Sequence, residues 1–366
     1  MNEKLKAGVL GGTGYVGQRL ITLLHDHPYF DVKVIAASER SAGKSYYDAV
    51  KGKWKLSQGI PDNIGPMVVK DLHNIDEISN EVDFVFCAVD MPANEIREIE
   101  ENYAKSETPV VSNNSAHRLT PDVPIIIPEV NPEHLYIIEK QRKRLGTSRG
   151  FIVTKPNCSI QSYVPAINAL MDFRPSMLSV CTYQAISGSG KTFADWPEMI
   201  DNVIPFIPGE EEKSEQEPLK VLGHINGDEI VKAYEPVITA QCIRVPAAEG
   251  HLAAVSVSFK HRPSMETIID CWNNFEGKPQ LLKLPTAPKQ FLTYFSEDNR
   301  PQTRLDREAE NGMGITLGRL REDNIFDYKF VCLSHNTLRG AAGGSVLTAE
   351  LLASEGYLEA KCDAGK

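Results

Sequence analysis

The sequence lacks long apolar runs and an excess of positive charge. No stretch reaches the roughly 18 apolar residues of a membrane-spanning helix, and the first apolar run, residues 7–10, leads into glycines and not into a signal-peptide core. The 39 Lys and Arg are outnumbered by 49 Asp and Glu, for a formal net charge of −10. This balance argues against nucleic acid or an anionic membrane as a partner. We therefore expect a cytoplasmic protein.

The sequence also lacks paired cysteines. Its seven cysteines are odd in number, lie far apart and never form a CxxC pair. This spacing argues against disulfides and against structural zinc, so no metal site is expected. In a reducing compartment most of these cysteines would be small buried hydrophobes. A cysteine with a chemical role therefore has to be recognised from its neighbours.

At 366 residues the chain exceeds the size at which one hydrophobic core usually stops growing, so two domains are expected. In residues 1–155 apolar strands alternate with helical stretches: strands end at residues 10, 37, 89 and 112, and helices cover residues 19–26 and 94–105. Such alternation predicts a mostly parallel sheet in an α/β domain.

The pattern changes after about residue 150. Residues 179–186, 237–244 and 251–260 alternate apolar and polar side chains, which is typical of half-buried strands. We predict an α+β catalytic and dimerisation domain with a largely antiparallel sheet over residues 156–336. An alanine-rich helix at about 337–356 is expected to return and pack on the first domain.

A glycine-rich turn, GGTGYVG at residues 11–17, joins the first strand to the first helix. Gly12, Gly14 and Gly17 satisfy GxGxxG in the strand–turn–helix context of the dinucleotide fingerprint. Phosphate would lie at the helix N-terminus, where free N–H groups and the helix dipole attract it. The motif alone is often only a tight turn, but its position favours a Rossmann-type domain. The residues expected to contact the cofactor are Gly12, Thr13, Gly14, Tyr15, Val16 and Gly17.

Hydroxyl and basic side chains follow the second strand. Ser38, Arg40, Ser41 and Lys44 would meet the ribose end of the cofactor, and they favour a 2′-phosphate and hence NADP. Glu39 instead favours NAD, because a carboxylate here could accept a hydrogen bond from the free 2′-hydroxyl of that cofactor. For any one of these residues an ordinary solvated turn is an equal alternative.

Cys158 is the candidate nucleophile. It follows a turn signal, Pro156 and Asn157, and precedes an amphipathic stretch predicted to begin a helix near Ser159. Exposed N–H groups and the dipole at a helix start would stabilise a thiolate and lower the pKa of the thiol. The alternative, a buried inert cysteine, is the better interpretation for the other six.

His251 is the candidate acid/base group. It lies where a loop containing Gly250 enters a long apolar strand, and Arg244 stands seven residues earlier. A histidine with a near-neutral pKa can take and return the thiol proton, while a guanidinium binds a carboxylate through two parallel hydrogen bonds. Each residue alone is more often structural, and only their pairing favours a functional site.

Five segments, in one order over most of the chain, resemble aspartate-β-semialdehyde dehydrogenases of the archaeal and fungal type. They are GGTGYVG, PNCSI, YQAISGSGK, GEEEK, and an arginine followed seven residues later by a histidine. The resemblance implies that Cys158 is the nucleophile, that His251 is the acid/base group and that Gln184 positions the substrate.

The resemblance also implies a binding set. Arg244 would bind the substrate α-carboxylate and Glu210 its amino group, and Asn157 would also contact substrate. Arg118 and Lys213 would hold inorganic phosphate. Lys220 is an alternative to Lys213 as a phosphate ligand. The residues implied near the cofactor are Ser187, Gly188 and Asn336. Thr337 is an alternative to Asn336 beside the nicotinamide.

The sequence departs from the family pattern just after the nucleophile, where Ile160, Gln161 and Ser162 replace the more usual threonine and glycine. This puts in question the packing of the helix beneath Cys158.

The expected activity is NADP-dependent interconversion of aspartyl phosphate and aspartate semialdehyde, in a homodimer or homotetramer. Two alternatives stay open: a malonyl-CoA or succinyl-CoA reductase of the same architecture, and a non-enzymatic NADP sensor. The sensor predicts no activated thiol, so the pH dependence of Cys158 alkylation would separate it from the enzymes.

Overall fold

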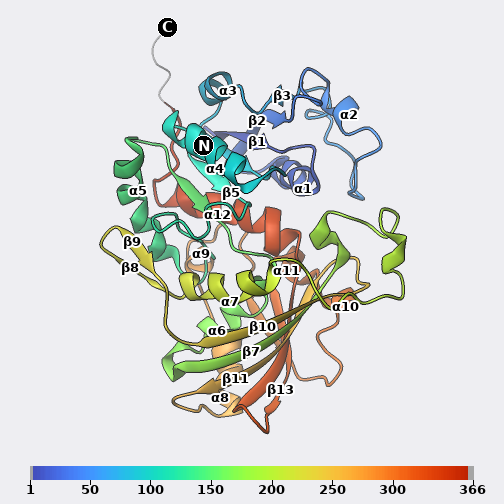
Figure 1. Cartoon of the computed structure of the whole chain (residues 1–366), viewed down its shortest axis with the longest axis vertical. Helices are drawn as coiled ribbons and strands as arrows, with labels where there is room; N and C mark the ends of the chain where they lie inside the picture. The colour runs from blue at the N-terminus through green and yellow to red at the C-terminus, as the bar shows by residue number, and fades with distance from the viewer. Residues whose placement is uncertain (1–2, 362–366) are drawn as a thin grey trace.

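The computed structural model describes residues 3–361, which form two sheet-based units joined by a central layer of helices (Figure 1). The first unit, at the top of Figure 1, contains a six-stranded parallel sheet in the order β3-β2-β1-β4-β5-β6. Its strands are β1 (Leu5–Leu10), β2 (Phe30–Ala37), β3 (Lys70–Asp71), β4 (Phe84–Cys87), β5 (Val110–Ser112) and β6 (Ile152–Thr154). Its helices are α1 (Tyr15–Leu24), α2 (Tyr46–Ala49), α3 (Ile75–Glu81), α4 (Ala93–Lys105) and α5 (Ile138–Leu145).

The parallel order follows from the alternation of strands and helices along the chain. Each connecting helix returns the chain to the same edge of the sheet, so consecutive strands run in one direction. The carboxyl ends of β1, β4, β5 and β6 therefore meet at one edge. The glycine turn after β1 and the segments after β5 and β6 all open onto that edge, which is the usual ligand side of an open parallel sheet.

The second unit contains a six-stranded sheet in the order β10-β7-β11-β14-β13-β12. Its strands are β7 (Pro175–Gln184), β10 (Val237–Arg244), β11 (His251–Phe259), β12 (Leu292–Phe295), β13 (Ile315–Glu322) and β14 (Tyr328–Ser334), and β8 (His224–Asn226) with β9 (Glu229–Val231) forms a separate hairpin. Its helices are α6 (Val164–Asn168), α7 (Glu210–Val221), α8 (Met265–Asn273), α9 (Lys278–Leu281), α10 (Thr303–Asp306) and α11 (Ala309–Gly312).

The prediction of a largely antiparallel sheet is wrong, because this sheet is mixed. The central pairs β7/β11, β11/β14 and β13/β14 are antiparallel, but β10/β7 and β12/β13 are parallel. The physical reason lies in the connections. A long segment that contains α7 links β7 to β10, and a segment with α10 and α11 links β12 to β13, and such crossovers permit parallel pairing.

The C-terminal helix α12 (Gly343–Ser354) follows an irregular turn, Leu338–Ala342, and packs against α1 and β5 of the first unit. Residues 343–352 are all buried. A helix that is covered on every side needs mostly apolar or small residues, and α12 consists largely of glycine, alanine and leucine; its buried Glu350 accepts from the Thr286 N–H.

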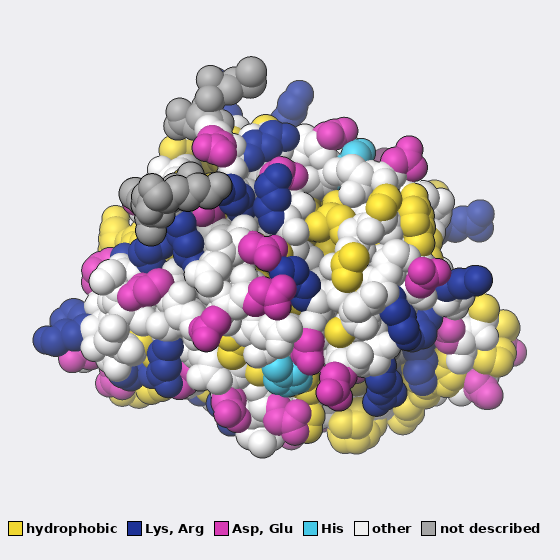
Figure 2. All heavy atoms as spheres, turned by 90° about the horizontal axis from the view of Figure 1, so that it is seen from above, with side chains coloured by type: hydrophobic (Ala, Val, Ile, Leu, Met, Phe, Trp, Pro, Cys, Tyr) yellow, Lys and Arg dark blue, Asp and Glu magenta, His cyan; other side chains and the backbone are white. Residues whose placement is uncertain are grey.

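The outer face of the first unit carries acidic and basic side chains interspersed, as Figure 2 shows. In residues 3–361 no helix is both long enough and apolar enough to cross a membrane.

Candidate active site

A cavity of about 290 Å³ opens where the two units meet, at the carboxyl ends of β5 and β6. Segments far apart in the sequence contribute to its wall. The predicted residues that line it are Val16, Arg118, Asn157, Cys158, Ser187, Gly188, Glu210, Lys213, Asn336 and Thr337. Gln184, Arg244 and His251 lie directly behind this wall, and the contacts described below connect them to it.

Cys158 lies four residues beyond the end of β6 and lines the cavity. The predicted helix behind it is broken: a single 3-10 turn, Ser159–Gln161, precedes the five-residue helix α6. Gly340 packs against it, since a Cβ atom built on Gly340 would lie 2.8 Å from the Cβ of Cys158. Ile160, Gln161 and Ser162 are buried, and Gln161 accepts a hydrogen bond from Arg339. The departure from the family pattern is thus accommodated by this contact.

The expected lowering of the Cys158 pKa is wrong. Burial raises the pKa of the thiol and nearby Glu210 raises it further, while Lys155, Arg118 and Arg244 lower it by a smaller amount. One short 3-10 turn offers little dipole, so desolvation dominates. The cations around Cys158 nevertheless offer a thiolate three favourable partners.

His251 begins β11 and is fully buried. Its Nδ1 accepts a hydrogen bond from the Ala185 N–H at 3.1 Å, whereas Nε2 has no partner in the described residues. Burial and the neighbouring Arg244 lower the pKa of His251 to about 3, so the ring is neutral at pH 7. Because Nδ1 is an acceptor, the ring proton lies on Nε2.

Gly188 brings Arg244 and His251 together. A Cβ atom built on Gly188 would lie 2.8 Å from Arg244 Nη1 and 3.1 Å from His251 Nε2, so a larger residue would displace both. Arg244 Nη1 also donates to the Ala185 carbonyl at 2.8 Å. The pairing predicted from the sequence is therefore present in space, with Ala185 contacting both side chains.

Glu210 is the centre of a second group of predicted residues. Its carboxylate accepts from Asn157 Nδ2 and Lys213 Nζ at 3.0 Å and from Gln184 Nε2 at 3.3 Å. Burial acts to raise the pKa of Glu210, but Lys213 and the amide donors outweigh it and hold the pKa below its usual range. Glu210 is therefore an ionised carboxylate at the cavity wall, able to bind an ammonium group.

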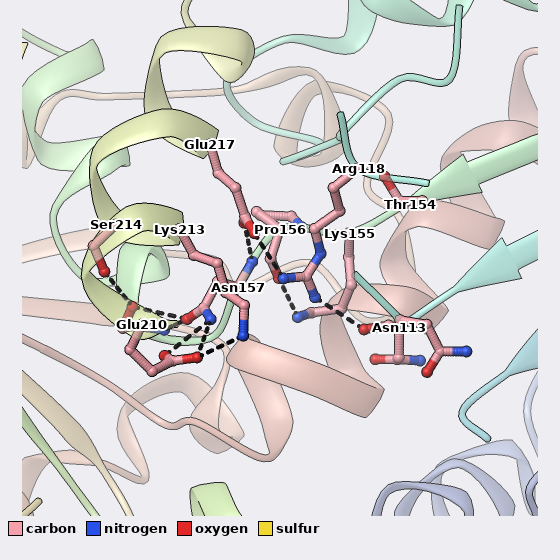
Figure 3. A network of polar contacts seen from close by, with 12 residues as sticks. Asn113, Arg118, Thr154, Lys155, Pro156, Asn157, Glu210, Lys213, Ser214 and Glu217 are labelled. Carbon is pink, nitrogen blue, oxygen red and sulfur yellow. Dashed lines mark hydrogen bonds and ion pairs between the residues drawn. The ribbon is translucent and has the colours of Figure 1, made fainter. Parts of the chain in front are cut away.

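Arg118 is held by Glu217, a residue to which the sequence analysis assigned no role. Glu217 Oε1 accepts from Arg118 Nη1 at 2.9 Å, and its Oε2 accepts from the Asn157 N–H at 2.6 Å (Figure 3). One buried carboxylate thus links the arginine loop to the residue before Cys158. The sequence contains one signal for this role: Glu217 and Lys220 repeat, seven residues later in α7, the E-x-x-K spacing of Glu210 and Lys213.

Lys220 cannot replace Lys213 as a ligand. Its Nζ donates to the carbonyl oxygens of Arg118, Thr120 and Val123 at 2.8, 2.6 and 2.8 Å. Three carbonyl acceptors occupy all three ammonium protons. Lys220 therefore holds the backbone of the arginine loop, while Lys213 lines the cavity.

Glu249, which the sequence interpretation also missed, connects the two units. Its Oε1 accepts from Tyr15 at 2.9 Å, from Arg19 at 2.7 Å and from Thr337 at 3.0 Å. Tyr15 belongs to the glycine loop and Glu249 stands two residues before His251. The contact therefore ties the glycine loop to the strand that carries the candidate acid/base group.

Glu249, Glu308 and His335 lie close enough together to resemble a metal site. However, His335 Nδ1 accepts from the Leu338 N–H at 3.2 Å, which leaves the proton on Nε2, the atom that faces the carboxylates. A histidine that binds a metal needs the reverse arrangement: the nitrogen that faces the metal is unprotonated, and the other ring nitrogen donates a hydrogen bond. The cluster therefore fits a charged hydrogen-bonding group better than a metal centre.

The glycine loop has the shape that a dinucleotide needs. A Cβ atom on Gly17 would lie 2.3 Å from the Gly11 carbonyl oxygen, so only glycine permits this approach of helix and strand. A Cβ atom on Gly14 would contact only the Gly11 carbonyl oxygen, at 3.4 Å, and no side chain caps the N-terminus of α1. The first-turn N–H groups can therefore receive a phosphate.

The loop between β2 and α2 holds the residues predicted for the 2′-phosphate. Ser38, Arg40 and Lys44 are exposed there, whereas Ser41 is buried. Lys44 Nζ donates to the Arg40 carbonyl at 2.7 Å, so the two basic residues lie together. At the nicotinamide side, Asn336 donates to Ser187 Oγ and accepts from the Gly250 N–H, both at 2.8 Å.

Two family models match the chain. The model of the semialdehyde dehydrogenase NAD-binding domain matches residues 6–138, and that of the semialdehyde dehydrogenase dimerisation domain matches residues 167–339. Aspartate-semialdehyde dehydrogenases of Archaeoglobus fulgidus and Schizosaccharomyces pombe are each 44% identical to the chain, over 96% of its length and 99% of theirs.

A solved structure agrees with these relatives. The crystal structure of aspartate semialdehyde dehydrogenase with NADP from Candida albicans superposes with a TM-score of 0.87, at 38% identity, over 97% of this chain and all of that one. The likeness covers both units and the cavity between them, and the chain belongs to the aspartate-semialdehyde dehydrogenase family.

Proposed function

We propose that the chain catalyses the reversible, NADP-dependent reductive dephosphorylation of aspartyl 4-phosphate to aspartate 4-semialdehyde. This step would supply the biosynthesis of lysine, threonine and methionine. The observation that carries the proposal is the arrangement of one cavity. A thiol lies between an amino-acid-binding group, Glu210 with Arg244, and an anion-binding group that includes Arg118.

The binding groups match the two ends of the substrate. Ionised Glu210 would accept from the substrate ammonium group, and the planar guanidinium of Arg244 would bind its α-carboxylate through two hydrogen bonds. Gln184, which already donates to Glu210, would orient the substrate between them. Arg118 and Lys213 would bind the phosphate oxygens.

In the oxidative direction Cys158 attacks the aldehyde carbon and a carbon–sulfur bond forms, while the thiol proton passes to the carbonyl oxygen. A bound NADP would supply the hydride acceptor for this carbon. The hydroxyl proton would pass to the acid/base group, His251, and a thioester on Cys158 would result. A phosphate oxygen then attacks the thioester carbonyl, the carbon–sulfur bond breaks and the thiolate is released with the acyl phosphate.

His251 would serve both proton transfers. Its Nε2 lies 3.1 Å from a Cβ atom built on Gly188, which lines the cavity, so the Nε2–H could donate a hydrogen bond to the developing oxyanion, together with the Cys158 backbone N–H. To take up a proton, the neutral ring has to give up the bond from Ala185, because Nδ1 is its only unprotonated nitrogen. The low pKa favours rapid return of that proton.

A coupled assay tests the proposal. NADP reduction should require both aspartate semialdehyde and inorganic phosphate, and it should exceed by far any NADPH oxidation by malonyl-CoA or succinyl-CoA. A preference for an acyl-CoA would assign the chain to a reductase of the same architecture. Tight NADP binding with no turnover on any of these substrates would favour a sensor.

Three further expectations belong to this proposal. The boundary between cofactor-binding and catalytic domains is placed after residue 155, immediately beyond β6. A homodimer or homotetramer is expected, supported by the match to a dimerisation-domain model, and sedimentation equilibrium would decide between them. The cysteine usage supports a cytoplasmic location.

A further inference from the structure

Lys155 is a cation at the cavity for which the family pattern supplied no role. It directly follows β6, and its backbone N–H donates to the Ser112 carbonyl at 3.0 Å, which anchors it between the ends of β5 and β6. Only 3% of the residue is exposed, yet it lines the cavity with Arg118 and Cys158. Lys155 is therefore withdrawn from bulk solvent and open only to the substrate cavity.

The positive charge at this end of the cavity is not balanced. Lys155 Nζ donates to the Pro156 carbonyl at 2.5 Å, and in residues 3–361 it forms no ion pair. Glu217 pairs with Arg118 at 2.9 Å, and its charge also acts on Lys155. Two cations thus share one anion. A buried cation without a counter-ion is costly, so it indicates a site that an anionic ligand completes.

Unpartnered polar atoms surround the same position. Both side-chain polar atoms of Asn113 and the Nε of Arg118 are buried without a hydrogen-bond partner in the described residues. Figure 3 shows Asn113, Arg118 and Lys155 next to one another at the ends of the parallel strands. Buried donors are rarely left unsatisfied in folded proteins, so these atoms point to a bound group with several acceptors.

We propose that Lys155 is a further catalytic residue, whose ammonium binds the phosphoryl oxygens beside Arg118 and Asn113 during formation and cleavage of the acyl phosphate. This inference rests on the proposed function, because it assigns a residue to the phosphate step of that reaction. A dianion at this place balances the two cations and provides acceptors for the unpartnered donors.

The same arrangement couples phosphate binding to protonation. Burial and the neighbouring Arg118 lower the pKa of Lys155 to about 7, and the other charged groups that face it are Cys158, Glu217 and Arg339. A bound phosphate stabilises the ammonium form and raises this pKa again. Phosphate affinity should therefore weaken as the pH rises above about 7 and the free enzyme loses the Lys155 proton.

The test uses Lys155→Met, which keeps the length of the side chain and removes its charge. Aldehyde and NADP are mixed with the full-length enzyme, first without phosphate and then with inorganic phosphate. Without phosphate the reaction stops at the thioester, so the amplitude of the burst, one NADPH per active site, is retained in the variant even where the loss of the Lys155 charge beside Cys158 slows its rate. With phosphate, the KM for phosphate should rise at least tenfold, as expected for loss of a charge-assisted hydrogen bond.

Two variants control this measurement. Lys143→Met alters an exposed lysine of α5 and should leave the burst and the phosphate KM unchanged. Lys155→Arg keeps a permanent charge, so it should bind phosphate as wild type does. Its phosphate affinity should lack the loss above pH 7 that deprotonation of Lys155 causes in wild type. The ionisation of phosphate itself affects both enzymes alike. Thermal melting of each variant verifies that it is folded.

The outcomes separate this inference from the proposed function. An unchanged phosphate KM in folded Lys155→Met would overturn the role of Lys155 while the activity stands. Loss of the burst in that variant would also overturn it, because Lys155 would then serve the thiol and not the phosphate. Absence of the burst and of phosphate-dependent turnover in wild type would instead refute the proposed function.

Discussion

Replacing Glu217 by glutamine perturbs the contact between the phosphate-binding arginine and the nucleophile. Glu217 does not line the cavity and is 2% exposed, but its two oxygens bind Arg118 and the backbone of Asn157. Both partners are donors. A glutamine amide offers one oxygen and one NH₂ group, so one donor would face another donor and the ion pair would lose its charge.

The size of the effect follows from these two bonds. Each charge-assisted hydrogen bond contributes about 1.5–3 kcal/mol, and removing one partner of a buried ion pair costs about 3–5 kcal/mol. We therefore expect Glu217→Gln to lower the free energy of unfolding by about 3–5 kcal/mol. For a domain of this size each kcal/mol lowers Tm by roughly 2–4 °C, which predicts a decrease of roughly 10 °C.

Activity should respond in a way that separates positioning from simple destabilisation. At 25 °C the variant should remain folded, yet its KM for phosphate should rise, because Arg118 is no longer held, and kcat should fall as the Asn157–Cys158 backbone loosens. Glu212→Gln changes an exposed carboxylate of the same helix and should alter neither value. If Glu217→Gln lowers Tm but leaves the phosphate KM and kcat at wild-type values, Glu217 is structural only and the reasoning is refuted.

Three other variants test the proposed roles directly. Cys158→Ser should bind NADP normally but lose nearly all turnover, because an alcohol is a far poorer nucleophile, and substantial residual activity would contradict covalent catalysis. His251→Ala should lower kcat roughly a hundredfold or more with a smaller change in KM, and an unchanged kcat would make this histidine structural. Replacing Arg40 and Lys44 together by alanine should raise the KM for NADP at least tenfold and leave the weaker NAD reaction nearly untouched. Equal weakening of both cofactors would remove these residues from the 2′-phosphate site.

Local patterns predicted much of the fold. The strand at residues 237–244 coincides with β10, and GxGxxG runs from the end of β1 into the first turn of α1, because hydrophobic alternation and glycine turns are properties of neighbouring residues. The direction of β10 beside β7 could not be inferred in this way. It depends on where the long segment containing α7 returns the chain, and that is decided by tertiary packing.

The residues of the site also divide into those that local sequence patterns predict and those that depend on tertiary packing. Cys158, His251 and Glu210 carry recognisable motifs, and the structure brings Cys158 and Glu210 to one cavity, with His251 directly behind its wall. Glu217 and Lys220 look like a solvated helix surface in the sequence, yet they bind residues 60 and 102 positions away. The pKa of Cys158 was predicted in the wrong direction, because the dipole of a helix start can be read locally whereas burial cannot.

The central claim is that an aldehyde becomes an acyl phosphate through a thioester on Cys158. Its most direct test is mass spectrometry of enzyme mixed with NADP and aspartate semialdehyde in the absence of phosphate, then denatured in acid and digested. The account predicts that the peptide containing Cys158 gains the mass of one aspartyl group, and that inorganic phosphate added before denaturation removes it. An unmodified Cys158 peptide in a sample that has formed one NADPH per active site would contradict the account.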